Sequence, residues 1–424
     1  MMKKNVLVFP CGSEIALEVY RSLEHSTHFN IIGANSVDDH GRFVFNNYID
    51  GLPFIDDVNF IPKFKNIIEE NKIDIIYPAM DSVITKLKSH ENELGCIIIG
   101  STLETTEICL SKELTYNRLK DIILTPKTYS ENEIKSYPVF VKPKIGYGSR
   151  GAKKILNCEM LLSHLSEYQN SIISEFLNGD EYTVDCFTDK YGKLRFCGAR
   201  LRKRISNGIS VNTISIDGNN NKFLYIANKI NENLKFRGAW FLQVKRNELG
   251  ELVLLEIASR LGGSSSLYRG KGINFAQLSL FDALGYDVEI IENNYHIEMD
   301  RALDNKYKTD IEFNEVFVDF DDCIIIDNKS YNTELMKFIF DCLNKNIKIS
   351  LLSRHKGDLV KKLEELKIFT LFDRVIHIDQ NKQKSDYIDN FNSIFIDDSF
   401  AERIDVANKC KIPVFGVDMI DVLI

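Results

Sequence analysis

The feature that most constrains the fold is an alternation of short apolar runs with amphipathic stretches over the first hundred residues. The apolar runs have the length of buried strands, and the stretches between them carry apolar residues at helical spacing. This alternation predicts βαβ units, and therefore a parallel, doubly wound sheet. We expect strands at 5–9, 29–34, 73–79 and 96–100, and helices at 14–23, 61–72 and 81–94, the last with Asp81 or Ser82 as N-cap.

The first expected strand-to-helix turn, PCGSE at 10–14, contains one glycine and no GxGxxG pattern. A dinucleotide site needs several glycines, so that the backbone can approach the pyrophosphate. The turn therefore favours a tight strand-to-helix connection over a dinucleotide site.

The pattern changes between about residues 110 and 300, where strands dominate and antiparallel sheets are expected. A helix at 111–121 precedes these strands, and a polar, mixed segment at 292–314 is expected to connect to a last α/β domain, where alternation returns. The fold class is thus α/β and α+β: a Rossmann-like domain at 1–105, a domain with antiparallel sheets at 106–305 and a Rossmann-type domain at 313–424. The expected antiparallel strands are 137–144, 171–177, 181–189, 194–203, 240–246 and 252–258.

Composition excludes several classes of protein. The net charge of −8 argues against a general nucleic-acid surface, which would need a basic face. The nine cysteines are scattered singly, as expected for reduced thiols in a reducing compartment. No stretch approaches the roughly 18 apolar residues of a membrane helix. We therefore expect a cytoplasmic protein with no nucleic-acid or membrane partner; a homodimer is left open.

The middle of the chain carries a candidate phosphate site. Lys142 lies on an expected strand, and Gly146, Gly148 and Gly151 follow in a loop. Glycines let backbone N–H groups approach phosphates, and a strand lysine supplies a fixed positive charge. The loop is not the GxxxxGK[ST] type, and taken alone a flexible hairpin loop fits it equally well.

A candidate cation site follows. Gln243 and Glu256 lie on neighbouring strands of an expected hairpin that turns through NELGEL, at 247–252. Their side chains can converge on one hard cation, which prefers oxygen ligands.

This succession resembles the ATP-grasp superfamily over residues 1–300, in particular its carboxylate–amine ligases of the carbamoyl-phosphate-synthase-like type. The resemblance implies that Lys142 and Lys112 hold ATP phosphates and that a loop from Gly148 to Gly151 closes over them. It also implies that the Glu175 carbonyl and the Leu177 N–H contact adenine, in the hinge SEFL, and that Glu181 holds the ribose. Gln243 and Glu256 would then bind Mg²⁺ or Mn²⁺, and Arg260 would steady the phosphoryl groups.

One position departs from the family. Many members read E-x-N-x-R where this chain reads EIASR, so Ala258 stands in place of an asparagine metal ligand. Either the second Mg²⁺ has fewer protein ligands, or Gln243, water and ATP complete its coordination.

Three basic residues occupy one face of an expected strand by the two-residue period: Arg200, Arg202 and Arg204. They could form a solvated strand edge, where basic residues block pairing. Alternatively, Arg200 and Arg202 could bind ATP phosphates or an anionic acceptor.

The segment EVFVDFDD, at 315–322, places Asp319 and Asp321 two residues apart at a strand end. Two close carboxylates repel each other unless a cation neutralises them or one takes a proton. Mg²⁺ and acid/base chemistry are therefore indicated. A strand-end serine, a lysine and an acidic pair follow in order: Ser353, Lys384 (with Lys382 as its rival), Asp397 and Asp398.

This order resembles the haloacid-dehalogenase-like (HAD) phosphohydrolases, over residues 313–424. The resemblance implies that Asp319 is the nucleophile and Asp321 the general acid/base. Ser353 and Lys384 would hold the phosphoryl oxygens. Mg²⁺ would be bound by Asp319, the Asp321 carbonyl and Asp397. Cys323 stands where Thr or Val is usual and is not expected to be catalytic.

Together these features predict an enzyme with two activities. The larger part would join a small-molecule carboxylate to an amine through an acyl phosphate, releasing ADP and phosphate. The last domain would be a Mg²⁺-dependent phosphatase acting on a phosphorylated small molecule. The alternatives are an ATP-binding regulatory protein with a degenerate ligase site, favoured by Ala258, and a phosphatase with a nucleotide-binding regulatory module.

Overall fold

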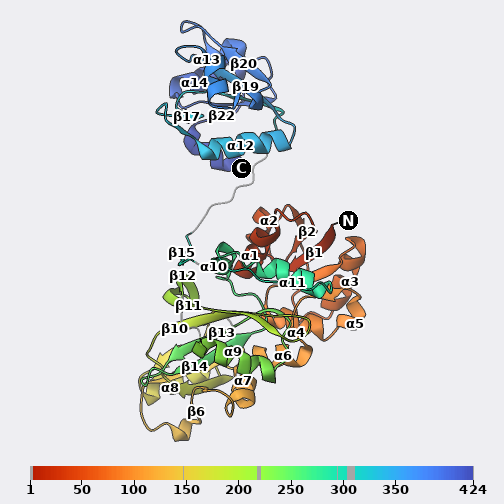
Figure 1. Cartoon of the computed structure of the whole chain (residues 1–424), viewed down its shortest axis with the longest axis vertical. Helices are drawn as coiled ribbons and strands as arrows, with labels where there is room; N and C mark the ends of the chain where they lie inside the picture. The colour runs from red at the N-terminus through yellow and green to blue at the C-terminus, as the bar shows by residue number, and fades with distance from the viewer. Residues whose placement is uncertain (1–2, 147, 217–220, 294, 303–310, 424) are drawn as a thin grey trace. The chain divides into compact units, whose positions relative to one another are not determined.

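A computed structural model describes residues 3–146, 148–216, 221–293, 295–302 and 311–423. The chain divides into two compact units, residues 1–303 and 304–424, and each is described by itself (Figure 1). All nine cysteines are free. Across the described residues, no helix combines the length and apolar character that crossing a lipid bilayer requires.

Unit 1 begins with a parallel sheet in the order β3-β2-β1-β4-β5, as predicted. Val6 and Val8 of β1 join one hydrophobic cluster, whereas Leu7 and Phe9 join another. A strand buried on both faces needs helices on both sides, which is why the apolar run is continuous. The elements are β1 (Lys4–Phe9), α1 (Glu14–Leu23), β2 (Phe29–Ala34), α2 (Gly41–Val44), β3 (Asn47–Ile49), α3 (Phe60–Glu70), β4 (Ile75–Pro78), α4 (Asp81–Lys88), α5 (Glu91–Leu94) and β5 (Ile97–Ile98).

The single helix predicted over 81–94 is wrong. The segment forms α4 and α5, and the N-cap of α4 is Met80. The Ser89 hydroxyl donates to the Lys86 carbonyl at 2.8 Å, a local bond that competes with continuation of the helix. Gly95 then ends α5 in the left-handed conformation, at φ 66°.

The middle of unit 1 contains two sheets, and their strands pair antiparallel, as predicted. The smaller has the order β6-β9-β7-β8, and the larger β14-β13-β10-β11-β12-β15. Between the parallel sheet and β6 lie α6 (Leu103–Leu110) and α7 (Lys112–Leu119). The smaller sheet contains β6 (Thr128–Tyr129), β7 (Val139–Pro143), β8 (Lys153–Ile155) and β9 (Ser171–Glu175), with η1 (Glu131–Glu133) and α8 (Cys158–Glu167) between them.

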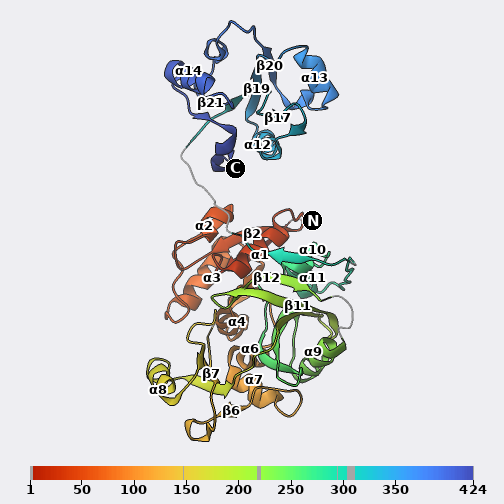
Figure 2. The same ribbon diagram turned by 90° about the vertical axis from the view of Figure 1, so that its left-hand side faces the viewer.

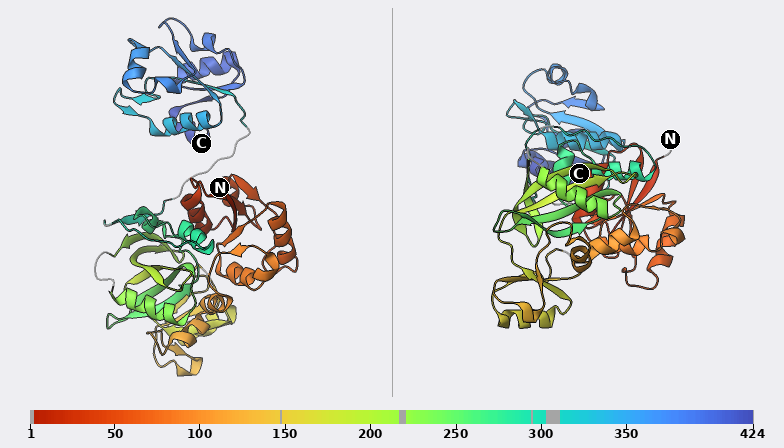
Figure 3. Two further views of the ribbon diagram at one scale, coloured as in Figure 1. Left: turned by 45° about the vertical axis from the view of Figure 1, so that its right-hand side comes forward. Right: turned by 60° about the horizontal axis from the view of Figure 1, so that its bottom comes forward.

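The larger sheet packs against α9 (Asn221–Asn233), whose buried Phe223, Ile226 and Ile230 join the cluster below the strands (Figure 3). The sequence pattern did not predict α9, β12 or β15. Residues 294 and 303–310 of the predicted connecting segment, including the expected boundary at 305, lie outside the described residues. The elements are β10 (Glu181–Thr188), β11 (Leu194–Ser206), β12 (Ile209–Ser215), β13 (Gly238–Arg246), β14 (Leu252–Ala258), α10 (Ser266–Gly270), α11 (Phe275–Ala283) and β15 (Glu298–Asp300).

Unit 2 is a parallel sheet in the order β20-β19-β16-β21-β22. Figure 2 shows α14 on one face and α12 and α13 on the other, in agreement with the two clusters to which they contribute. The elements are β16 (Glu315–Val318), β17 (Ile325–Ile326), β18 (Ser330–Tyr331), α12 (Thr333–Asn344), β19 (Lys348–Ser353), α13 (Leu359–Glu365), η2 (Phe369–Leu371), β20 (Arg374–His377), η3 (Lys384–Tyr387), β21 (Ser393–Ile396), α14 (Phe400–Cys410), β22 (Val414–Phe415) and η4 (Val417–Leu423).

Candidate functional site

Three adjoining cavities in unit 1 collect most of the predicted ATP-site residues. The lysine cavity, of about 190 Å³, is lined by Lys112, Lys142, Gly148, Glu181, Gln243, Glu256 and Arg260. The hinge cavity, of about 70 Å³, shares Lys142 and Glu181 with it and adds Glu175 and Leu177. The arginine cavity, of about 470 Å³, shares Gln243, Glu256 and Arg260 with the lysine cavity and adds Arg200 and Arg301.

Lys142, on β7, lines both the lysine cavity and the hinge cavity. Its Nζ donates to the Leu255 carbonyl at 3.0 Å. Burial lowers the pKa of Lys142 to about 8, while Glu256 raises it and Lys112 lowers it further. The ammonium group is therefore poorly compensated, and a bound anion would stabilise its charged form.

Gln243 and Glu256 are directly opposed on β13 and β14, which confirms the predicted hairpin. The nearest ion-pair partner of the Glu256 carboxylate is Lys112, 4.0 Å away. Lys112 Nζ also donates to the Gly146 carbonyl at 3.2 Å, so it ties the helix start to the glycine loop. Oxygen atoms of Gln243 and Glu256 could hold a hard cation beside two lysines.

Glu181, predicted to hold ribose, carries two cationic partners. It forms an ion pair with Arg202 and lies 3.6 Å from Lys245. Arg202 Nη1 also donates to Gln243 Oε1 at 2.7 Å. One guanidinium group, that of Arg202, therefore joins Glu181 to Gln243.

Arg260 lines the lysine cavity and makes a contact that the sequence did not predict. Its Nε donates to Asp81 Oδ2 at 2.8 Å, although 179 positions separate the two residues. Asp81 lies at the start of α4, and no local sequence pattern links it to Arg260. A second such pair, Arg301 with Glu14, lies in the arginine cavity at 2.5 Å.

The three arginines of β11 do not share one face. Arg200 and Arg202 are buried, and Arg200 pairs with Asp185 at 2.6 Å. Arg204 is exposed and pairs with Asp300, because register shifts flank its position in the β11–β12 ladder. The expectation of a common face is therefore wrong for Arg204.

Gly151 does not line the described cavities with the other glycines. It adopts φ +72°, and a Cβ there would lie 2.7 Å from the Tyr168 ring. Its contribution is to the path of the loop. Gly148 lines both the lysine and the arginine cavities.

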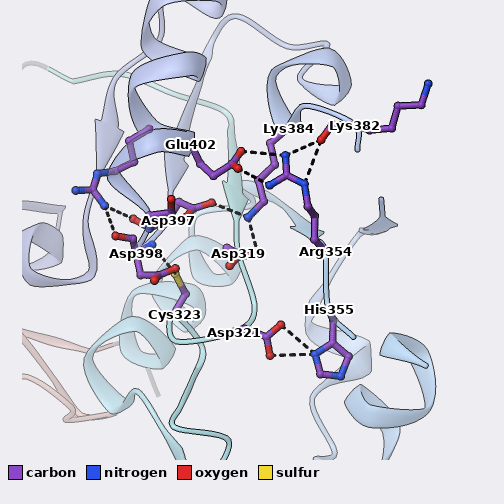
Figure 4. Close-up of polar contacts among 12 residues, drawn as sticks. Asp319, Asp321, Cys323, Arg354, His355, Lys382, Lys384, Asp397, Asp398 and Glu402 are labelled. Carbon is purple, nitrogen blue, oxygen red and sulfur yellow. Dashed lines mark hydrogen bonds and ion pairs between the residues drawn. The ribbon is translucent and has the colours of Figure 1, made fainter. Parts of the chain in front are cut away.

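The candidate site of unit 2 lies at the carboxyl ends of parallel strands, as the sequence predicted (Figure 4). Lys384 Nζ lies 2.7 Å from Asp319 Oδ1 and 2.6 Å from Asp397 Oδ2. Lys382 is exposed, and its carbonyl accepts from Arg354, so Lys384 is the lysine that contacts the acids. Burial raises the pKa of Asp319, and Lys384 opposes that rise. Ser353 is buried at the end of β19, and its hydroxyl has no hydrogen-bond partner among the described residues.

Burial also raises the pKa of Asp397, to about 6, and its two oxygens already have partners. Oδ2 accepts from Lys384, and Oδ1 accepts from the Ser399 N–H at 2.8 Å. Among the described side chains, Asp319, Cys323 and Asp398 bring their ligand atoms within 4.8 Å of one another. The predicted metal set of Asp319, the Asp321 carbonyl and Asp397 shares Asp319 with this cluster and stays a prediction.

Asp321 contacts His355, a residue that the sequence pattern did not predict. His355 Nδ1 lies 2.9 and 3.0 Å from its two carboxylate oxygens. Burial and the neighbouring carboxylates raise the pKa of Cys323, which keeps its thiol protonated and agrees with a non-catalytic role.

The comparisons with known proteins agree with the fold of unit 1. Residues 167–309 match the family model described as "ATP-grasp in the biosynthetic pathway with Ter operon". No curated protein matches the sequence.

Three solved structures illustrate the likeness. The biotin carboxylase domain of Hydrogenobacter thermophilus 2-oxoglutarate carboxylase, with MgADP and bicarbonate, is 16% identical (TM-score 0.60; 70% of this chain, 74% of that one). The L-amino acid ligase of Bacillus licheniformis is 17% identical (0.54; 67% and 74%). The N5-carboxyaminoimidazole synthetase of Staphylococcus aureus is 15% identical (0.55; 68% and 79%). The family match and the shared fold show that the chain contains an ATP-grasp domain.

Proposed function

We propose that unit 1 is an ATP-dependent ligase that joins a small-molecule carboxylate to an amine. The observation that carries the proposal is the lysine cavity, where two lysines and Arg260 face the oxygen donors Gln243 and Glu256. An ATP-grasp match over residues 167–309 and structural relatives named as a ligase, a synthetase and a carboxylase support it.

ATP would extend from the hinge cavity into the lysine cavity. Adenine would lie against the hinge at Glu175 and Leu177, with Glu181 near the ribose. Lys112 and Lys142 would hold the phosphates. Gln243 and Glu256 would hold Mg²⁺, or Mn²⁺, which neutralises charge on the phosphate oxygens.

The chemistry follows from this placement. A carboxylate oxygen attacks the γ-phosphorus of ATP, ADP leaves, and an acyl phosphate forms. The amine nitrogen then attacks the carbonyl carbon, loses a proton, and displaces phosphate to leave an amide. Lys142 and Arg260 would stabilise the charge that develops during transfer, so catalysis is mainly positioning and electrostatics.

The carboxylate would enter through the arginine cavity, which borders the same donors. Its walls combine Arg200 and Arg301 with apolar residues such as Ile15 and Phe241. Such a surface suits an acid with an apolar body. We also propose that the chain can form a homodimer, because the structure of the carboxylase relative is described as a domain dimer.

A screen of acids against amines, with ADP release as the readout, tests the ligase. Turnover is expected only when an acid and an amine are both present. Full turnover with the acid alone would instead indicate a kinase-like phosphorylation. Full ATP turnover in a Glu256→Gln chain would favour the regulatory alternative.

We propose a second function for unit 2, a Mg²⁺-dependent phosphatase. The observation that favours it is the buried Asp319–Lys384–Asp397 cluster at the strand ends. Asp319 would attack phosphorus and form an aspartyl phosphate, and Ser353 and Lys384 would hold the phosphoryl oxygens. Asp321 would protonate the leaving group and then activate water.

Phosphate release from p-nitrophenyl phosphate and from a panel of phosphorylated small molecules tests this function. Activity should require Mg²⁺ and disappear in an Asp319→Asn chain, while amide formation remains. Loss of both activities on that change would support a phosphatase whose nucleotide-binding part is regulatory.

A further inference from the structure

Most of the acidic residues that line the lysine and arginine cavities form ion pairs with arginine. In the described part of the chain, the carboxylates lining the lysine and arginine cavities are Glu14, Asp81, Glu181 and Glu256. The first three pair with Arg301, Arg260 and Arg202, respectively. Glu256, with Lys112 at 4.0 Å, is the carboxylate most available to a metal ion.

The remaining oxygen donor at the β13–β14 hairpin is an amide. Gln243 lies opposite Glu256, whereas Ala258, on the strand of Glu256, offers a methyl group. One carboxylate and one amide fit a single Mg²⁺, which usually keeps waters and substrate phosphates as its other ligands. These donors do not fit a pair of ions.

The Arg202 guanidinium lies beside this single cation site, where it also forms an ion pair with Glu181. Its Nη1 donates to Gln243 Oε1 at 2.7 Å, and its Nη2 donates to the Gly208 carbonyl at 2.7 Å. The side chain is buried, and its Nε has no hydrogen-bond partner among the residues that the structure describes.

The same arginine reaches the glycine loop through Gly208. A Cβ at Gly208 would lie 2.3 Å from Ser149 Oγ and 2.8 Å from the Gly148 carbonyl carbon. Arg202 thus lies between the cation-site amide and the loop expected over the phosphates, and it lines both cavities.

We propose that this pocket works with one divalent cation, held by Gln243 and Glu256, and that the Arg202 guanidinium supplies the second positive charge on the ATP phosphates. The inference rests on the proposed ligase function and identifies what compensates for Ala258. A guanidinium group stays charged at every working pH and can donate two parallel hydrogen bonds to phosphate oxygens. In Arg202 the donors without an acceptor among the described residues are Nε and one N–H of Nη2.

The test counts Mn²⁺ ions retained per molecule of a non-hydrolysable ATP analogue, adenylyl imidodiphosphate, by equilibrium dialysis. The Mn²⁺ retained by the chain without nucleotide is subtracted, so that metal held by unit 2 is not counted. We expect one Mn²⁺ per nucleotide. Arg202→Gln should weaken nucleotide binding by about 10- to 100-fold, the loss of hydrogen bonds from a charged donor. Arg202→Lys should recover part of it.

Arg204→Gln is the matched control, because Arg204 lies on the same strand but is exposed and paired with Asp300. It should bind as the parent chain does. Two Mn²⁺ per nucleotide, or equal affinities for the Arg202→Gln and Arg204→Gln chains, would overturn the inference and leave the ligase intact. Absence of nucleotide binding in the parent chain would overturn both. The parent ratio needs no change in the ligase pocket, so a poorly folding variant does not compromise the test.

Discussion

The pKa values of two buried lysines, one in each unit, are shifted in opposite directions. Burial lowers the pKa of Lys142 to about 8. Lys384 is also buried, which alone would lower its pKa, but Asp319 and Asp397 raise it above the ordinary value. At Lys142 burial outweighs the nearby carboxylates Glu256 and Glu181, and Lys112 lowers the pKa further. Lys384 instead contacts two carboxylates directly.

This contrast indicates what each site lacks. The lysine cavity has uncompensated positive charge, so an anion such as a nucleotide phosphate would stabilise it. The unit 2 cluster has more carboxylates than cations, so a metal ion would stabilise it. The unit 1 site should therefore bind an anion and the unit 2 site a cation. A substitution in one site should abolish the activity of that site and leave the other activity unchanged.

Substitution of the unit 2 carboxylate should have the largest effect. Asp319→Asn removes the proposed nucleophile and should lower phosphatase activity by at least about 10³-fold. ADP release by the ligase should not change. Asp322→Asn is the control: this exposed neighbour accepts a hydrogen bond from the Asp327 N–H, which asparagine can also do. Loss of phosphatase activity in both chains would contradict the assignment.

Substitution of the unit 1 lysine should have the next largest effect, in the opposite activity. Lys142→Met removes a charge from the phosphate site and should lower ligase turnover by about 10²- to 10³-fold. Phosphatase activity should persist. Lys144→Met, two residues along and paired with Glu113 at 2.9 Å, should retain turnover. Equal losses of ligase turnover in the Lys142→Met and Lys144→Met chains would contradict the assignment of Lys142 to the phosphate site.

The shifted pKa of Lys142 predicts a pH effect on nucleotide affinity. The charged ammonium binds phosphate, and with a pKa of about 8 in the free protein it loses its proton as the pH rises through 8. Affinity for adenylyl imidodiphosphate should therefore fall roughly fivefold between pH 8 and pH 9. Calorimetry at several pH values measures this. The Lys142→Met chain should show no such fall; a parallel fall in that chain would assign the effect to another group.

A smaller effect is expected at the β11–β12 turn. Gly208→Ala must adopt φ +77° and place a Cβ against the glycine loop. Gly192→Ala, at φ +79° with nothing within 4 Å, is the control for strain alone. Both should lose about 1–2 kcal/mol of stability by thermal unfolding, but only Gly208→Ala should also weaken nucleotide binding several-fold. Equal nucleotide affinities would separate Gly208 from the phosphate site.

The sequence predicted more of the unit 2 site than of the unit 1 site, because the two sites are assembled differently in the fold. The unit 2 site lies at strand ends of one parallel sheet, where strand order brings Asp319, Ser353 and Asp397 together. A strand-end pattern is therefore enough to place them. His355 was missed because a contact with Asp321 depends on a loop conformation that periodicity does not encode.

The unit 1 site is assembled from elements far apart in the chain. Gln243 and Glu256 were placed correctly, because a short hairpin fixes their register. The Arg260–Asp81 pair was not predicted, since it depends on how the parallel sheet and the larger antiparallel sheet meet within unit 1. Arg204 was placed wrongly because irregular register in the β11–β12 ladder breaks the two-residue period.

The central claim is that unit 1 activates a carboxylate as an acyl phosphate. The most direct measurement uses the Asp319→Asn chain and ¹⁸O in the carboxylate of whichever acid supports ADP release. Mass spectrometry of the phosphate should find one ¹⁸O atom, carried from the carboxylate when the amine displaces phosphate. Unlabelled phosphate would show that water cleaved ATP directly, and would contradict the account.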